Sequence, residues 1–233
     1  MKKSKNYTNQ SAKIDREKKY SPKEALVKIK EIAAAKFDET IEAHFSLGID
    51  PKQADQQLRG TMTLPKGTGQ KKRIVAICKQ GEAEKAKEAG AIDAGDVDVI
   101  ERIQKGWFDF DILLTSPDMM GKIGRLGRTL GSKGLMPNLK SGTIVKDVVT
   151  AVKEFSKGKV EFRNDKYGII HISIGKVSFS EENLIENFEA VYDLLNKEKP
   201  SKSKGVYMKS ISVASTMGPG VWIEPMKIKW GEK

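Results

Sequence analysis

The chain is poor in the residues that most catalytic and metal sites require. Its 233 residues include one cysteine and two histidines, and aromatic residues make up 7%. A single cysteine excludes an intramolecular disulfide and, with so few histidines, a Cys/His metal cluster. Cys78 lies in an apolar, strand-like segment, so we interpret it as a packing residue rather than a nucleophile. A reducing cytoplasm is the expected compartment.

Long apolar runs and catalytic motifs are also missing. No segment approaches the roughly 20 apolar residues of a membrane-spanning helix, and the Lys-rich segment 1–20 lacks the apolar part of a secretory signal. The chain contains no Gly-x-Ser-x-Gly nucleophile motif and no acidic metal loop. Its glycine-bearing segment 67–72 precedes a predicted strand instead of following one, so it does not fit a phosphate-binding loop. We therefore predict no enzyme activity, no cofactor and no metal.

Positive charge is what the chain has in excess. Lysine and arginine number 42 against 31 acidic residues, a net charge of +11. Such a balance favours a polyanionic partner, either nucleic acid or an anionic membrane surface. The segment 119–146 has no acidic residue and carries Lys122, Arg125, Arg128, Lys133, Lys140 and Lys146. A second basic patch holds Lys199, Lys202, Lys204 and Lys209. The alternative is a basic face that is only solvated.

Hydrophobic periodicity predicts an α+β domain built from both ends of the chain. A capping box at Ser21–Glu24 begins a helix that runs to about residue 35, and residues 41–48 alternate as a half-buried strand. Later strands are expected at 159–163 and 169–174, joined as a hairpin, and at 206–213 and 221–228. An amphipathic helix follows Ser180. Neither end has enough strands alone, so we expect one shared sheet.

The middle of the chain has a different pattern. Strands at 73–78 and 112–115 alternate with helices at 82–89, 97–105, 118–128 and 147–155, which is typical of an α/β domain with a largely parallel sheet. We predict a discontinuous domain of residues 1–67 and 159–233, with 1–20 as a flexible basic arm. Residues 68–158 form the inserted domain. Gly67, Gly69 and Gly158 mark the two crossings and are the predicted hinge.

Two segments of the predicted α+β domain are suited to RNA contact. The loop 215–220 offers small hydroxyls, backbone N–H groups and one thioether, which permit close approach to a sugar–phosphate backbone. In 36–40, Phe37 stands between Lys36 and Thr40 and can pack on a base or ribose. The alternatives are a plain strand connection for the loop and a core-covering role for Phe37.

Polar side chains on the predicted strands extend this surface. Glu42 and His44 share one face of a strand, and Ser210 and Ser212 alternate on the strand that leads into the loop. A histidine on such a strand is more often a surface or packing residue than a general base. Hydroxyl groups there are placed to meet ribose 2′-hydroxyls.

Several motifs together resemble a known family. They are KFDET at 36–40, GIDP at 48–51, DQQLRG at 55–60, GWFDFD at 106–111, GLMPN at 134–138, EFRNDK at 161–166 and STMGP at 215–219. In this order they resemble the bacterial form of the large-subunit ribosomal protein L-one family, over roughly residues 20–225. The resemblance implies a discontinuous α+β domain with both termini, an inserted Rossmann-like α/β domain and a hinge.

The resemblance also implies a function. The chain would bind large-subunit rRNA on the ribosome and form the mobile stalk that assists release of exit-site tRNA. It would also repress translation of its own operon by binding the mRNA, and it would be monomeric when free. The implied rRNA and mRNA interface is Lys36, Phe37, Thr40, Glu42, Ser210, Thr216, Met217 and Gly218, with Lys166 and His171 as weaker candidates. The implied tRNA or secondary rRNA patch is Lys122, Arg125, Arg128, Lys133 and Lys140.

Two other classes of protein are weighed against this one. An enzyme with a nucleotide site in the middle domain is disfavoured because the phosphate-binding loop is missing. A membrane-surface or general polyanion-binding module is disfavoured because no basic amphipathic helix is predicted.

Overall fold

The computed structural model describes residues 4–225, a mixed α/β chain. Two compact units are present. Among the described residues, the terminal unit holds 4–58, 64–69 and 162–225, and the middle unit holds 59–63 and 70–161. This division differs from the predicted one mainly in residues 59–63. They form β2 (Arg59–Thr63), which pairs with β6 (Lys159–Arg163) in a two-stranded sheet.

A four-stranded sheet organises the terminal unit. Its strands are β1 (Thr40–Leu47), β7 (Ile169–Lys176), β8 (Met208–Ser215) and β9 (Val221–Ile223), in the order β7-β1-β8-β9 with antiparallel neighbours. The prediction that both ends of the chain complete one sheet is therefore confirmed. The predicted last strand, 221–228, corresponds to β9, and its residues 226–228 lie outside the described range.

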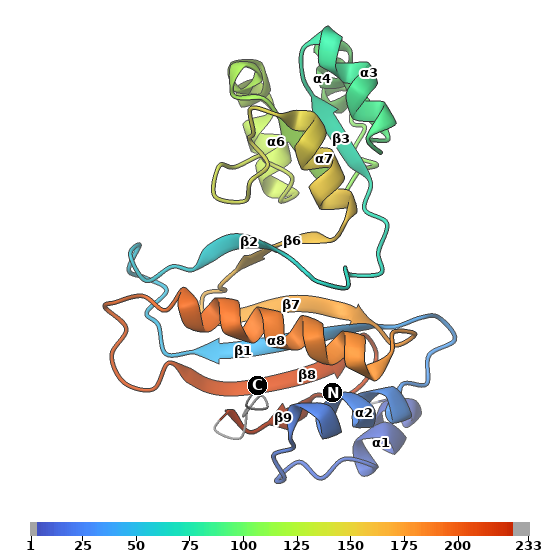
Figure 1. Ribbon diagram of the computed structural model, residues 1–233, viewed down its shortest axis with the longest axis vertical. Coiled ribbons are helices and arrows are strands. Elements are labelled where there is room, and N and C mark those ends of the chain that lie inside the picture. Colours follow the sequence, from blue (N-terminus) through green and yellow to red (C-terminus); the bar gives the residue numbers. More distant parts are fainter. Residues whose placement is uncertain (1–3, 226–233) are drawn as a thin grey trace. The chain divides into compact units, whose positions relative to one another are not determined.

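Helices cover one face of this sheet. Helix α8 (Glu181–Lys197) lies over the strands in Figure 1, and α2 (Pro22–Ile32) packs against α8, β8 and β9. Phe45 of β1 and Phe188 of α8 stack with ring centroids 5.6 Å apart. The predicted capping box begins α2, because Ser21 and Glu24 exchange hydrogen bonds of 3.1 and 3.3 Å. The opposite face of the sheet keeps the polar side chains of the alternating strands.

Residues 4–20 form a helix and buried contacts in place of the flexible arm that we predicted for residues 1–20. Residues Lys5–Ala12 form helix α1, and the buried Gln10 side chain donates a 2.9 Å hydrogen bond to the carbonyl of Ile32. Ile14 and Tyr20 are also buried, and the Tyr20 amide donates to the Trp222 carbonyl. These contacts dock the segment on the terminal unit. The high lysine content of this segment predicted an exposed arm, because composition does not show contacts with distant residues.

The predicted strands at 159–163 and 169–174 and the turn between them are present, but the two strands do not pair as a hairpin ladder. Strand β6 pairs with β2, whereas β7 pairs with β1, and β6 and β7 meet at an isolated bridge between Asn164 and Ile170. Asn164 explains the divergence, because its amide donates to the Leu58 carbonyl and its side-chain oxygen accepts from the Leu58 amide. The chain turns back directly after Asn164, where the Asp165 amide donates to the Ile169 carbonyl at 2.8 Å, so pairing between the two strands stops at this single bridge.

A three-stranded parallel sheet forms the centre of the middle unit. Strand β3 (Ile74–Ile77) lies between β4 (Asp93–Gly95) and β5 (Ile112–Thr115), which confirms the predicted parallel sheet. Helices α3 (Gln80–Glu88) and α7 (Val148–Ser156) pack with Ile74, Ala76 and Cys78 on one side. Helix α4 (Val97–Gln104) and the segment 117–132 pack with Val75 and Ile77 on the other. Cys78 is a buried packing residue, as expected.

The segment 118–128, predicted as one helix, is a series of short turns. These are η1 (Pro117–Met119), α5 (Met120–Ile123), η2 (Gly124–Leu126) and α6 (Gly127–Ser132). Four glycines, Gly121, Gly124, Gly127 and Gly131, interrupt the helical pattern here. None of the helices within residues 4–225 combines the length and apolar character needed to cross a membrane.

Candidate nucleic-acid interface

The start of β1 and the end of β8 are joined by two threonines. The Thr216 hydroxyl accepts a 2.9 Å hydrogen bond from the Thr40 amide, and the Thr216 amide donates to the Thr40 carbonyl at 3.0 Å. Thr216 lies just after the last residue of β8, so this exchange continues the strand pairing into the loop 215–220. Two of the predicted RNA-contact segments, 36–40 and 215–220, are therefore brought together.

A buried acid, Glu39, strengthens this junction. Its carboxylate accepts hydrogen bonds from the Met217 amide at 2.9 Å and the Ala35 amide at 3.1 Å. Burial would raise the pKa of Glu39, but the hydrogen bonds, with that from Met217 the largest, outweigh it and lower the pKa below its usual 4.5. Sequence reasoning did not select Glu39, because its partner stands 178 positions away. We call Glu39, Thr40, Thr216 and Met217 the junction cluster.

Two predicted contact residues project from this junction into solvent. Phe37 is 55% exposed and Met217 is 60% exposed, and Lys36 beside Phe37 is exposed as well. The alternative that Phe37 covers the hydrophobic core is therefore wrong. An exposed aromatic ring and an exposed thioether at one junction provide apolar surfaces for a ribose or base.

Lys176 places a cation beside the junction cluster. This last residue of β7 is paired with Thr40 in the sheet register, and its ammonium donates to the Thr40 hydroxyl at 2.8 Å and to the Asp38 carbonyl at 3.3 Å. Asp38 in turn accepts hydrogen bonds from the Ser178 amide and hydroxyl. Sequence reasoning missed Lys176, because only the strand register shows that it adjoins Thr40.

Gly218 is required by close packing in the loop. A Cβ atom added there would lie 2.5 Å from the Ser215 hydroxyl oxygen, and the Gly218 amide donates to the Ser215 carbonyl at 3.1 Å. Ser215 is buried, with 4% of its surface exposed, so its side chain has little room to move. Only glycine lets the loop close this tightly before Pro219.

The polar face of the sheet continues from the junction cluster. Glu42 lies opposite Ser173, His44 opposite His171, and Ser46 opposite Ser210. The Nδ1 atoms of the two histidines are 2.9 Å apart. Burial, followed by the nearby His171, lowers the pKa of His44, while Glu42 acts in the opposite direction. Glu42, His171 and Ser210 thus share one face with the hydroxyl groups between them.

The predicted contact residues do not form one compact cluster. Ser210 and Lys166 belong to the far end of the sheet, since Ser46 pairs with both Ser210 and Ile169. Thr40 and Ser46 are separated by about 20 Å at roughly 3.4 Å per residue. Lys166 lies in the turn after β6, with its ammonium 5.1 Å from the centre of the Tyr167 ring. A ligand that touches all of these residues must be extended.

The second basic patch lines a groove in the terminal unit. Lys202, Lys204 and Lys209 surround a hollow of about 540 Å³ together with Gly48, Asp50, Gln53 and Gln56. Lys202 is ion-paired with Asp55, and Gln56 accepts from the Asp50 amide at 2.9 Å. The groove is therefore partly neutralised and has a hydrogen-bonded wall.

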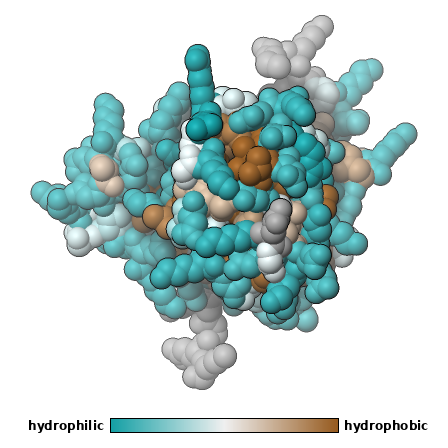
Figure 2. Space-filling view, turned by 90° about the horizontal axis from the view of Figure 1, so that it is seen from above, coloured by the Kyte–Doolittle hydropathy of each residue, from teal (hydrophilic) through white to brown (hydrophobic). Residues whose placement is uncertain are grey.

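In the middle unit, the predicted basic residues are largely solvent-exposed. Lys122 is ion-paired with Asp96 at 2.8 Å, and the Lys133 ammonium lies 4.6 Å from the centre of the Phe108 ring. Arg125 and Arg128 are exposed on the short turns. A Cβ atom added at Gly121, Gly124 or Gly131 would meet nothing within 4 Å, so these glycines leave the backbone open. Figure 2 shows a mainly hydrophilic face with a hydrophobic patch and smaller hydrophobic spots around it.

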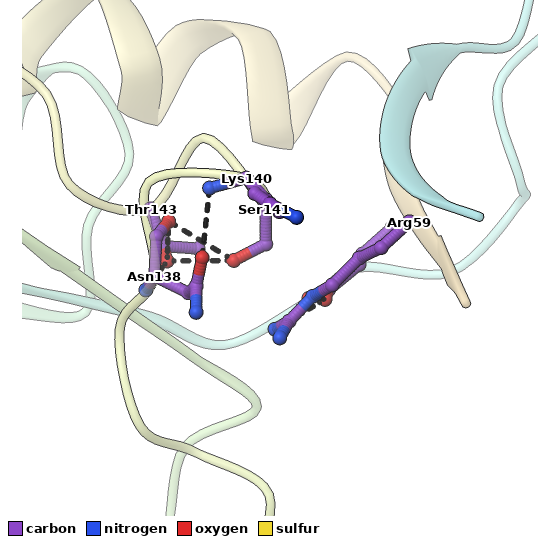
Figure 3. Close-up of polar contacts among 6 residues, drawn as sticks. Arg59, Asn138, Lys140, Ser141 and Thr143 are labelled. Carbon is purple, nitrogen blue, oxygen red and sulfur yellow. Dashed lines mark hydrogen bonds and ion pairs between the residues drawn. The ribbon is translucent and has the colours of Figure 1, made fainter. Parts of the chain in front are cut away.

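Lys140 is presented by a hydrogen-bonded turn. The Asn138 carbonyl accepts from the Thr143 amide at 3.2 Å and from the Ser141 hydroxyl at 3.1 Å, and the Lys140 amide donates to the Asn138 side chain at 2.8 Å (Figure 3). Gly142 completes the turn with a φ of 58°, which favours glycine. The same view shows Arg59, which is ion-paired with Glu161 at 2.8 Å. The motif 134–138 thus leads into a rigid turn that leaves Lys140 exposed.

The geometry and charge of the polar sheet face indicate the class of protein. A net charge of +11, together with an open sheet face of hydroxyl and imidazole groups, has the features of an RNA-binding protein. Across residues 4–225 no group of three or more His, Cys, Asp or Glu side chains is placed to hold a metal ion.

Comparison with known families then places the chain. It belongs to the Ribosomal protein L1p/L10e family, which it matches over residues 29–219. The resemblance that the motifs predicted is therefore confirmed. The chain is a large-subunit ribosomal protein that binds rRNA, and the family is not one of enzymes. The matched range contains the junction cluster and the whole middle unit.

Proposed function

We propose that this protein binds its rRNA site through the junction cluster and the polar face of the sheet. Lys36, Phe37, Thr40, Glu42, Ser210, Thr216, Met217 and Gly218 make the principal contacts, with Lys166 and His171 at the margin. Two hydrogen bonds carry this proposal: the Thr40 amide donates to the Thr216 hydroxyl, and the Met217 amide donates to the Glu39 carboxylate. They preorganise exposed Phe37 and Met217, so little ordering is needed when RNA binds.

Shape and hydroxyl contacts dominate this interface. The junction cluster contains one internally paired carboxylate and several hydroxyl groups, and it is not densely basic. Such a surface suits contacts with ribose 2′-hydroxyls and unpaired bases. Phosphate attraction comes mainly from the exposed lysines and arginines elsewhere.

On the ribosome, the protein forms the mobile stalk and assists release of deacylated tRNA from the exit site. The basic residues Lys122, Arg125, Arg128, Lys133 and Lys140 contact tRNA or a second part of the rRNA. Gly67, Gly69 and Gly158 act as the hinge. Their φ values of 66°, 69° and 105° explain why glycine occupies these positions, because other residues rarely adopt them. The free protein is a cytoplasmic monomer.

The same interface represses translation of the protein's own operon. An mRNA segment that mimics the rRNA site would occupy the junction cluster, so free protein accumulates on the mRNA only when rRNA sites are filled. This arrangement needs no second RNA site. Unlabelled rRNA should therefore displace the mRNA segment completely.

Competition binding at about 0.3 M salt tests the proposal, because most nonspecific phosphate attraction is suppressed there. A labelled fragment of the large-subunit rRNA stalk, here called the stalk fragment, competes with unlabelled bulk tRNA and duplex RNA. Nanomolar binding that survives a large excess of competitor supports the proposal. Displacement by any RNA would reduce the protein to a general polyanion binder.

A further inference from the structure

The edge strand of the terminal sheet carries an exposed tryptophan that the proposed interface does not use. Trp222 in β9 is 45% exposed, whereas its neighbours Val221 and Ile223 are 0% and 1% exposed. Because side chains alternate along a strand, the indole projects from the polar face of the sheet. One exposed ring alone does not mark a binding site, so its meaning depends on the groups beside it on the same face.

The strand register places Trp222 in a row with polar groups. It lies opposite Ser212 of β8, Ser212 lies opposite His44 of β1, and His44 lies opposite His171 of β7. Directly opposed residues of antiparallel strands share a face. The row therefore crosses all four strands, a distance of about 14 Å at roughly 4.8 Å per strand.

The chemistry of the row fits an RNA strand. Trp222 provides a flat apolar ring, Ser212 a hydroxyl, and His44 and His171 two imidazoles whose centroids are 5.0 Å apart. Three acidic groups stand near the row but outside it. Glu42 is two residues from His44, Asp165 is 3.7 Å from His171, and Glu224, two residues from Trp222, is ion-paired with Lys19 at 3.5 Å. Unpaired bases stack on aromatic side chains, and the ribose hydroxyl pairs with hydroxyl or imidazole groups.

We propose that Trp222 is a stacking platform for an unpaired nucleobase of the bound RNA, at the edge of the polar sheet face. The bound RNA strand runs from the junction cluster across Ser212 to the indole of Trp222. The inference rests on the proposed function, because it requires that the polar face bind RNA. It adds a contact that none of the predicted interface residues supplies and widens the footprint to β9.

Affinity for the stalk fragment at about 0.3 M salt is the first test. Trp222→Ala should weaken binding by roughly 5- to 100-fold, the range for loss of one base–aromatic stack. Trp222→Phe keeps an aromatic face and should stay within about threefold of the unmodified protein. Trp107→Phe is the matched control in the middle unit, where Trp107 lies beside Arg102, and it should leave affinity unchanged. Unchanged affinity in Trp222→Ala would overturn the inference while leaving the proposed function intact.

Fluorescence gives a second test that does not depend on how well Trp222→Ala folds. In the variant Trp107→Phe/Trp230→Phe, Trp222 is the sole tryptophan, and stacking on a base should strongly quench its emission when the stalk fragment is added. Trp222→Phe/Trp230→Phe, which keeps only Trp107, should show little quenching. Binding without quenching in the first variant would overturn the inference. Failure of the unmodified protein to bind the stalk fragment would overturn the proposed function and this inference with it.

Discussion

The carboxylate of Glu39 accepts a hydrogen bond from the backbone amide of Met217, 2.9 Å away and 178 positions later in the sequence. This contact fixes the loop 215–220 to the start of β1. Glu39 is almost fully buried, so its carboxylate would be costly without such partners. The hydrogen bond fixes the backbone of Met217 and so sets the position from which its exposed side chain projects.

Glu39→Gln should therefore loosen the loop. The amide keeps one acceptor oxygen but presents an NH₂ group towards one of two backbone donors, so we expect a loss of about 1–3 kcal/mol in unfolding free energy. Unfolding in urea at pH 7 measures this loss. Glu88→Gln, an exposed acid in α3, is the control and should change stability little. Equal stability of the two variants would contradict the role given to Glu39.

The lowered pKa of Glu39 predicts a dependence on acid. A carboxyl group with a lowered folded-state pKa stabilises the native state above its unfolded value, near 4.5, and loses that contribution as pH falls through the folded value. The unfolding free energy of the unmodified protein should fall across this acidic range more steeply than that of Glu39→Gln. Urea titrations at several pH values between about 6 and 3 compare the two slopes.

Thr216→Ala should weaken specific RNA binding without altering the electrostatic contribution to the binding free energy. Loss of the hydroxyl removes the oxygen that accepts from the Thr40 amide and a hydrogen-bonding group for the RNA, and we expect a cost of about 2–4 kcal/mol. Met217→Asp should have a similar effect. The slope of log affinity against log salt should barely change, which a salt titration with the stalk fragment measures. Thr216→Ser retains the hydroxyl and should keep most of the affinity.

Lys133→Ala should show the opposite behaviour. Removing one phosphate-binding cation lowers the magnitude of the salt slope by about one and leaves discrimination between specific and bulk RNA almost unchanged. Lys133 also covers the Phe108 ring. Lys133→Met keeps this packing but removes the charge, so it distinguishes the effect of charge from the effect of packing. If Lys133→Ala and Thr216→Ala reduced affinity with the same salt dependence, the division into specific and electrostatic surfaces would be wrong.

Two glycine substitutions test the packing around their positions: Gly218→Ala should weaken RNA binding, and Gly124→Ala should raise stability. Gly218→Ala brings a methyl group against the Ser215 hydroxyl and should reduce affinity for the stalk fragment at least about tenfold by displacing the loop (about 1.4 kcal/mol). Gly124→Ala meets no atom within 4 Å and should stabilise the middle unit by about 0.4–1 kcal/mol. RNA titration and thermal unfolding of both variants test the pair. A gain of affinity in Gly218→Ala would refute the close-packing argument.

Local patterns determined much of this protein. The capping box at Ser21–Glu24, the alternation of residues 41–48 and the amphipathic helix after Ser180 each predicted an element that is present. These features depend on neighbours a few positions apart, which a sequence displays directly. The motifs 36–40 and 215–219 likewise identified the two segments that meet at the junction cluster.

Tertiary structure decided the rest, because the deciding contacts join residues far apart in the chain. Glu39 meets the Met217 amide, and Lys176 and Trp222 join the polar face, only through the pairing of distant strands. Asn164 turned a predicted hairpin into strands of two different sheets by pairing with Leu58. A sequence states which side chains alternate on a strand, but only the folded chain selects which strand lies beside it, since register is set by packing of the whole sheet.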